Sequence, residues 1–285
     1  MEKTKEKRHI FLRHPLLVAI ALPLVTVLIA SFLSSLLTGW LIMGTPEWMT
    51  IGSEINAILL AVFRIVIALL IILIMKLSRG HTFQFGFRRQ NLKLSFGLAA
   101  FGFLMVADNL IEGAVFSGVF QSTPLGIFSA VLAGIAPGLF EEVVCRGVVL
   151  SNMMRQWHGK ENYILKSVLA SGIIFGLIHL MNLGSADVPS TIMQVFYAAG
   201  MGIFFGAVYA RTRNLWGTGV IHAIIDISYN LVVWQENGFA LQDLVSGIAI
   251  AVVYTAIGLY LIRPKKQGDI SLLWRPDISA AEEPH

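Results

Sequence analysis

Long apolar stretches follow one another along almost the whole chain, separated by short polar segments. Eight of them, each of about 20 residues or more, span residues 16–43, 55–75, 94–120, 125–154, 164–183, 191–210, 215–234 and 241–262. At 1.5 Å per residue, about 20 helical residues cross a hydrocarbon core of about 30 Å. Because backbone groups in lipid must find partners within their own segment, each stretch predicts a transmembrane helix. We therefore expect an all-α, polytopic membrane helical bundle with eight transmembrane helices.

The charged residues agree with this pattern and give it an orientation. Only 13% of the residues are charged and 56% are hydrophobic, which excludes an ordinary soluble domain. Apart from Arg64 and Arg146, which lie inside apolar stretches, the Lys and Arg residues gather before the first stretch and around the loops after the second, fourth, sixth and eighth. Basic residues collect in cytoplasmic loops, so both termini are predicted to be cytoplasmic.

The remaining composition narrows the class of protein further. We expect a single integral membrane domain over residues 1–285, located in the plasma membrane if the cell is bacterial. The net charge of +4 is explained by basic loops beside anionic headgroups, so membrane lipids are expected partners and nucleic acid is not. The single cysteine, Cys145, excludes an intrachain disulfide and a cysteine-cluster metal site.

Several ionisable residues lie where lipid should exclude them. An ionised side chain at mid-membrane costs about 2.5–3.5 kcal/mol on insertion, so such residues usually face the bundle interior and mark function. They are Glu141, Glu142 and Arg146 on the fourth stretch, His179 on the fifth, and His222 and Asp226 on the seventh. Counted along each helix from the nearest basic residue, Glu141, His179 and His222 lie about 21, 20 and 14 Å deep. Three helices could therefore bring these groups to one site.

Spacing on the fourth stretch suggests different roles for its two glutamates. Glu142 and Arg146 are one helical turn apart and can form an ion pair. Glu141 then points to another side of the helix, as a free carboxylate. Pro137, one turn earlier, cannot donate a backbone hydrogen bond, so we expect a kink beside the carboxylates.

These residue types suit the hydrolysis of an amide bond. Glu141 could take a proton from water and return it to the leaving amine, while His179 holds the same water. His222 would face the oxyanion, oriented by Asp226 one turn away. Alternatively, Glu141, His179 and His222 could bind zinc with an open fourth position. The sequence does not decide between zinc and no cofactor, although the zinc-binding pattern His-Glu-x-x-His is absent.

The same residues resemble the CPBP (CAAX protease and bacteriocin-processing) family of intramembrane proteases, which is related to the CAAX prenyl endopeptidase. The family signatures are Glu-Glu-x-x-x-Arg, Phe-x-x-x-His and His-x-x-x-Asn or Asp. They are matched in order by Glu141-Glu142 with Arg146, Phe175 with His179, and His222 with Asp226. The resemblance covers residues 127–231, which we expect to be the catalytic core. It implies a metalloprotease or a glutamate-type peptidase in which Glu142 and Arg146 hold the first glutamate in place.

The resemblance also assigns the remaining roles. It implies that Glu141 is the catalytic base, that His179 is its partner on the water, and that His222 and Asp226 form the oxyanion side. The chain departs from the CAAX enzymes because Asp226 stands where they have Asn. An ionised Asp cannot donate to an oxyanion, so we expect Asp226 to orient His222 instead. The expected partner is a peptide or protein substrate associated with the membrane, which would be prenylated in CAAX processing.

Two other functions fit the same features. A non-catalytic immunity or regulatory protein could retain the scaffold and bind a partner, and a proton-coupled transporter could also use buried acids and histidines. A second group of ionisable residues, Arg64, Asp108 and Glu112, lies on the second and third stretches. We expect an Arg64–Asp108 ion pair there, with a structural role.

Overall fold

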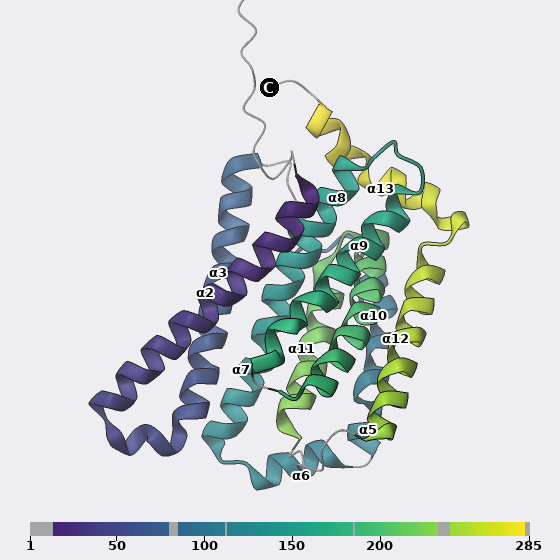
Figure 1. The fold of residues 1–285 in the computed structure, drawn as a ribbon. Coiled ribbons are helices and arrows are strands. Elements are labelled where there is room, and N and C mark those ends of the chain that lie inside the picture. Colours follow the sequence, from purple (N-terminus) through teal and green to yellow (C-terminus); the bar gives the residue numbers. More distant parts are fainter. Residues whose placement is uncertain (1–13, 80–84, 112, 185, 233–239, 283–285) are drawn as a thin grey trace, which may run out of the picture.

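The protein is a bundle of helices, described here from a computed structural model (Figure 1). The structure describes residues 14–79, 85–111, 113–184, 186–232 and 240–282. All regular secondary structure in these residues is helical, as the sequence predicted. The elements are α2 (Pro15–Gly44), η1 (Pro46–Ile51), α3 (Gly52–Arg79), α4 (Leu92–Ala99), η3 (Ala100–Phe103), α5 (Leu104–Ile111), α6 (Ala114–Gln121), α7 (Pro124–Glu141), η4 (Glu142–Leu150), α8 (Ser151–Gln156), α9 (Tyr163–Ile178), η5 (His179–Gly184), α10 (Val188–Thr212), α11 (Leu215–Leu231), α12 (Leu241–Leu261) and α13 (Pro264–Glu282).

Six helical segments in the described residues are long and apolar enough to cross a membrane. They are Pro15–Gly44, Glu47–Leu77, Pro124–Gln156, Tyr163–Gly184, Val188–Thr212 and Leu241–Leu261. The chain is therefore an integral, multi-pass membrane protein. The expected total of eight spans and the cytoplasmic position of both termini stay predictions.

The other two expected spans are shorter or interrupted. The stretch 94–120 is divided among α4, η3, α5 and α6, with a break at Gly113, whose φ of 72° lies in the left-handed region. Glycine adopts that conformation without a steric penalty, so it can end a helix inside an apolar stretch. The stretch that begins at Leu215 forms α11, a helix of only 17 residues.

The helices form an inner group and an outer group. In α10, 67% of the most apolar window is buried within the protein, against 28% in α2 and 22% in α12. α10 packs between α9 and α12, while α7 packs against α3 and α11 (Figure 1). The outer helices are α2, α3 and α12. They carry most of the exposed large apolar side chains, which suit contact with lipid. The polar residues of α7, α9 and α11 are thereby kept away from lipid.

Three inner helices begin at residues that cap them. The side chains of Thr123, Asp187 and Asn214 accept hydrogen bonds from the first turns of α7, α10 and α11, respectively. Capping of this kind satisfies backbone N–H groups that have no partner within the helix. Hydrogen bonds from Ser190 also hold the pKa of the Asp187 carboxyl below its usual value. These caps fix where the helices that carry or support the polar residues begin.

Close contact between α9 and α10 depends on small residues. A methyl group at Gly172 on α9 would lie 2.6 Å from the backbone nitrogen of Ile203 on α10, closer than van der Waals contact permits. Gly202 makes the reciprocal approach to Gly172. Small residues therefore allow the two backbones to touch.

Replacing Gly172 with Ala should consequently lower stability by about 1–3 kcal/mol, the usual cost of overpacking a rigid contact. The matched control is Gly97→Ala on α4, where an added methyl group meets no atom within 4 Å. Thermal unfolding in detergent measures both variants. An equal melting temperature for the two would show that the α9–α10 contact can separate at little cost.

Candidate active site

The helix winding changes between the two adjacent glutamates. Glu141 is the last residue of α7, and η4, which begins at Glu142, is a π-helical segment whose nine residues are all buried. π-Helical turns are rare and occur frequently at functional sites. Pro137 lies within α7, so the irregular backbone begins one turn after the proline. The two adjacent carboxylates face different atoms of one residue, His222: Glu141 faces its Nε2 atom and Glu142 its Nδ1 atom.

Glu142 is the centre of a buried polar group. Its Oε1 atom lies 3.0 Å from Nη1 of Arg146, and the side chains of both residues are only 1% exposed. The ion pair expected from their spacing is therefore present. The same oxygen lies 3.2 Å from Nδ1 of His222 on α11. Arg146 also stacks on the ring of Phe175, with its Cζ atom 4.4 Å from the ring centroid. This group joins η4 to α9 and α11.

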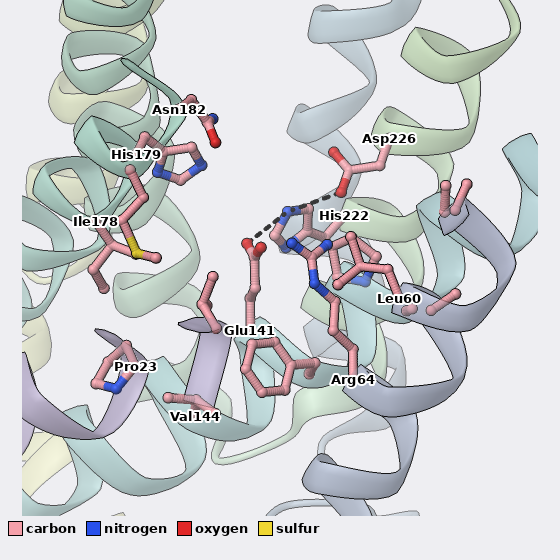
Figure 2. A pocket seen from close by; sticks show the side chains of 18 of the residues that line it. Pro23, Leu60, Arg64, Glu141, Val144, Ile178, His179, Asn182, His222 and Asp226 are labelled. Atoms are coloured by element: carbon pink, nitrogen blue, oxygen red, sulfur yellow. Dashed lines mark ion pairs between the residues drawn. The ribbon is translucent and has the colours of Figure 1, made fainter. Parts of the chain in front are cut away.

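The contact with Glu142 fixes the orientation of the His222 ring. A carboxylate can only accept a hydrogen bond, so Nδ1 of His222 is the donor. Nε2 then faces the other two carboxylates, 3.5 Å from Oδ2 of Asp226 and 3.8 Å from Oε2 of Glu141 (Figure 2). Both distances are ion-pair distances and exceed a hydrogen bond. The sequence suggested that Asp226 orients this ring; the structure adds Glu142, which makes the closer contact.

His179 is held by its own helix. It follows the last turn of α9, and its Nδ1 atom lies 2.8 Å from the carbonyl oxygen of Phe175. A carbonyl only accepts, so Nδ1 carries the proton and Nε2 keeps a free lone pair. Phe175 contacts both imidazoles, with ring centroids 5.1 Å from His179 and 6.0 Å from His222. The Phe-x-x-x-His spacing thus places the acceptor of one hydrogen bond and an aromatic spacer one turn before the histidine.

The four predicted catalytic residues line one cavity of about 460 Å³. Glu141 comes from α7, His179 from the end of α9, and His222 and Asp226 from α11 (Figure 2). The volume exceeds that of a single water, about 30 Å³ in the liquid, so water and a segment of peptide can enter together. A second cavity of about 130 Å³ shares His179, His222 and Asp226 with the first. The structure therefore brings together the residues that the sequence placed at similar depth.

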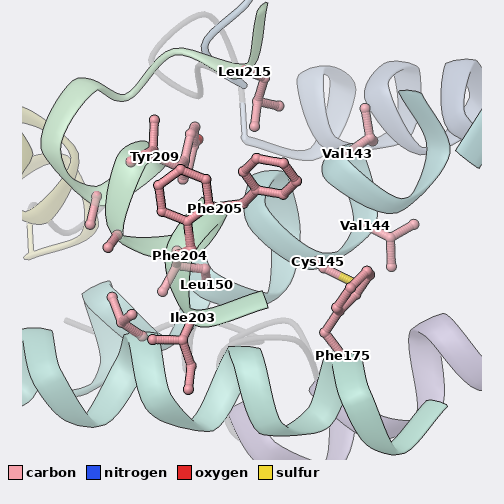
Figure 3. Close-up of a cluster of buried hydrophobic side chains, with 14 of the residues drawn as sticks. Val143, Val144, Cys145, Leu150, Phe175, Ile203, Phe204, Phe205, Tyr209 and Leu215 are labelled. Carbon is pink, nitrogen blue, oxygen red and sulfur yellow. The ribbon is translucent and has the colours of Figure 1, made fainter. Parts of the chain in front are cut away.

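A buried apolar cluster surrounds the polar group and holds it in place (Figure 3). Phe205 on α10 contacts the His222 ring, with ring centroids 5.6 Å apart, and the Cζ atom of Arg146 lies 5.7 Å from the Phe205 centroid. Cys145 is a free cysteine buried within the same cluster. The labelled members are Val143, Val144, Cys145, Leu150, Phe175, Ile203, Phe204, Phe205, Tyr209 and Leu215. Such packing restricts the rotamers of the side chains that it touches.

A bound zinc ion needs several ligand side chains close together. Within the described residues, no group of three or more His, Cys, Asp or Glu side chains is arranged to hold one. Glu141, His179 and His222 line the same cavity, but in this arrangement they do not form the compact set of ligands that zinc requires. In this arrangement the residues of the site therefore do not fit a resident zinc ion.

Sequence reasoning did not identify every polar residue of the cavity. Asn182 and Gln194 line it and are joined by a hydrogen bond of 2.8 Å. Polar residues near helix ends are ordinary, so nothing in the sequence distinguished these two. Arg64 on α3 also lines the cavity, although its position inside an apolar stretch was a visible signal.

The expected pairing of Arg64 with Asp108 stays a prediction. The side chain of Asp108 and the whole of Glu112 lie outside the described residues. However, α3 packs chiefly against α2 and α7, whereas α5, which carries Asp108, packs against α6 and α11. Arg64 therefore belongs with the residues of the cavity in the part of the chain that is described.

Comparison with known proteins agrees with the motifs. A family model described as type II CAAX prenyl endopeptidase Rce1-like matches residues 9–228, which include all four predicted catalytic residues. No curated protein and no solved structure matches the chain.

Proposed function

This chain belongs to the type II CAAX prenyl endopeptidase Rce1-like family, and on that premise we propose that it is an intramembrane endopeptidase that uses Glu141 to activate water. The substrate would be a membrane-associated peptide or protein, of the CAAX type that the family name indicates. The observation that carries the proposal is the convergence of Glu141, His179, His222 and Asp226 on one cavity from three separate helical segments.

The first step is the attack of water on the scissile carbonyl carbon. Glu141 accepts one proton from the water, while the free Nε2 lone pair of His179 accepts a hydrogen bond from the same water and aligns it. A carbon–oxygen bond forms, and the carbonyl π electrons move onto the carbonyl oxygen. Glu141 suits the role of base because, unlike Glu142, it forms no ion pair with an Arg of the described residues, and its side chain is 19% exposed.

The second step is the breakdown of the tetrahedral intermediate. The oxyanion lies on the side of His222, whose Nε2 atom faces the cavity and supplies a stabilising N–H when the ring is protonated. The carbon–nitrogen bond then breaks, and Glu141 returns its proton to the leaving amine. The products are a new carboxylate and a new amine, so no group remains covalently attached to the protein. Glu142 contributes by holding Nδ1 of His222.

An apolar cavity beside the catalytic cavity is an argument for a lipid-modified substrate. It has a volume of about 340 Å³, lies between α2 and α9, and adjoins the catalytic cavity because Ile178 and Met181 line both. Its lining is Ile20, Leu24, Ile174, Leu177, Ile178, Leu180 and Met181, without a polar side chain. We propose that it holds the prenyl chain of a substrate, since burial of such a chain is favoured by about 0.8 kcal/mol per CH₂. A prenylated peptide should therefore have a lower KM than its unmodified form.

The choice between direct water activation and a metal can be tested on purified protein. Peptidase activity in detergent or nanodiscs should be unchanged after extensive treatment with a chelator, with metal content measured in the same sample. The expected rate ratio of treated to untreated protein is about 1, because Glu141 and His179 act on the water directly. Loss of activity on chelation that zinc restores would replace this mechanism with a metal-dependent one on the same residues.

A further inference from the structure

Arg64 enters the catalytic cavity from a helix that carries none of the family motifs. It lies in the middle of α3 and lines the cavity together with Glu141, His222 and Asp226. Its guanidinium extends from α3 toward His222 and Asp226 of α11 (Figure 2). Among the described residues that line this cavity, Arg64 is the only Lys or Arg. The other arginine beside the site, Arg146, is fully buried and is paired with Glu142.

The hydrogen-bonding capacity of the Arg64 guanidinium is not fully used by the described residues. Its Nε atom is buried and has no hydrogen-bond partner there. A guanidinium within a membrane-spanning helix costs about 2.5–3.5 kcal/mol on insertion, so its retention requires a compensating interaction. Arg64 and Asp226 carry opposite charges and line the same cavity, which can provide such an interaction. The cavity is thus lined by an arginine as well as by the carboxylates of Glu141 and Asp226.

Apart from Arg64 and the two histidines, the charged side chains that line this cavity are the carboxylates of Glu141 and Asp226. Asp226 lies 3.5 Å from the same Nε2 atom of His222 that faces the oxyanion. An uncompensated carboxylate there would repel the negative charge that forms on the carbonyl oxygen, most strongly in a site of low dielectric. Glu141 adds a second carboxylate on the same side, 3.8 Å from Nε2.

We infer that Arg64 is a positioning residue that balances the charge of Asp226, so that this carboxylate can lie beside His222 without opposing the oxyanion. The inference rests on the proposed peptidase function for its kinetic consequence. It concerns the transition state, so loss of the Arg64 charge should lower kcat and leave KM nearly unchanged.

A double-substitution cycle tests the inference. Arg64→Gln should lower kcat about 10-fold to 100-fold, less than the roughly 10²–10³-fold cost of removing a direct oxyanion donor, because Arg64 acts through Asp226. The matched variant Arg64→Lys keeps the charge and should retain most of the activity. In the Asp226→Asn background, Arg64→Gln should lower kcat by less than about threefold, because the charge that it balances is already gone.

Several results would overturn the inference. Equal losses in both backgrounds would show that Arg64 acts independently of Asp226, and a rise in KM at constant kcat would show that it binds the substrate, for example through a carboxylate. If Asp226→Asn by itself abolishes cleavage, the melting-temperature cycle on the same four proteins decides the pairing.

A second measurement does not need activity and separates this inference from the proposed function. Melting temperatures of the same four proteins should show that Asp226→Asn recovers stability lost in Arg64→Gln, because a lone buried charge costs more than a removed pair. If the wild-type protein has no peptidase activity, the proposed function is wrong. The melting temperatures still decide whether Arg64 and Asp226 are paired. Purely additive melting shifts would refute the pairing itself.

Discussion

Glu141→Gln should lower kcat by about a thousandfold while the protein remains folded. General acid–base catalysis contributes about 10²–10⁴-fold, and Gln has nearly the same shape as Glu but cannot accept a proton. The side chain lines the cavity and takes no part in the Glu142–Arg146 ion pair, so little stability should be lost. Peptide cleavage by purified protein and its melting temperature in detergent measure the two effects.

Glu47→Gln is the matched control, because Glu47 is exposed in η1, away from the cavity. It should have wild-type activity. If Glu141→Gln also cleaves at the wild-type rate, Glu141 is not the base, and a binding or regulatory role on this scaffold becomes the better account. A melting temperature that falls sharply in Glu141→Gln would instead give the residue a structural role.

Arg146→Met should lower the free energy of unfolding by about 3–5 kcal/mol, because it leaves the Glu142 carboxylate buried without its ion-pair partner. Both side chains are almost fully buried, so water cannot replace the lost interaction. The stacking of Arg146 on Phe175 is lost as well. Unfolding by heat or denaturant in detergent measures the change.

The comparison variants for this effect are Arg89→Met, at an exposed position, and the double variant Glu142→Gln with Arg146→Met. Arg89→Met should change stability by less than about 0.5 kcal/mol. The double variant should be more stable than Arg146→Met alone, since it removes the unpaired charge. If Arg146→Met were as stable as Arg89→Met, the buried ion pair would have no structural importance.

The sequence predicted which side chains form the site better than it predicted the contacts between them. Ionisable residues inside apolar stretches are rare, so Glu141, His179, His222 and Asp226 could be selected on cost alone, and their spacing predicted the Glu142–Arg146 pair. The contact between Glu142 and His222 could not be predicted, because it joins η4 to α11 across 80 positions of sequence. The π-helical winding of η4 also has no signal in the composition of residues 142–150.

The fold was also predicted only in part from the sequence. Apolar length predicted the helical membrane bundle, and six segments have the expected length and hydropathy. It did not predict the break at Gly113, because hydropathy averages over a window and does not detect a single left-handed residue. Arg64 was visible as a charge within a span, but its partner depends on which helices pack together, and only the three-dimensional arrangement supplies that information.

The central claim is that water activated by Glu141 cleaves a peptide bond. The most direct test is to measure where oxygen from water is incorporated during cleavage. Purified protein in nanodiscs would be incubated in H₂¹⁸O with membrane-anchored peptides, including a prenylated CAAX-type peptide, and the products weighed by mass spectrometry. The account predicts one internal cleavage, one ¹⁸O atom in the new carboxylate, and no product from Glu141→Gln under the same conditions. Absence of cleavage of every peptide by the wild-type protein, or equal product from Glu141→Gln, would contradict it.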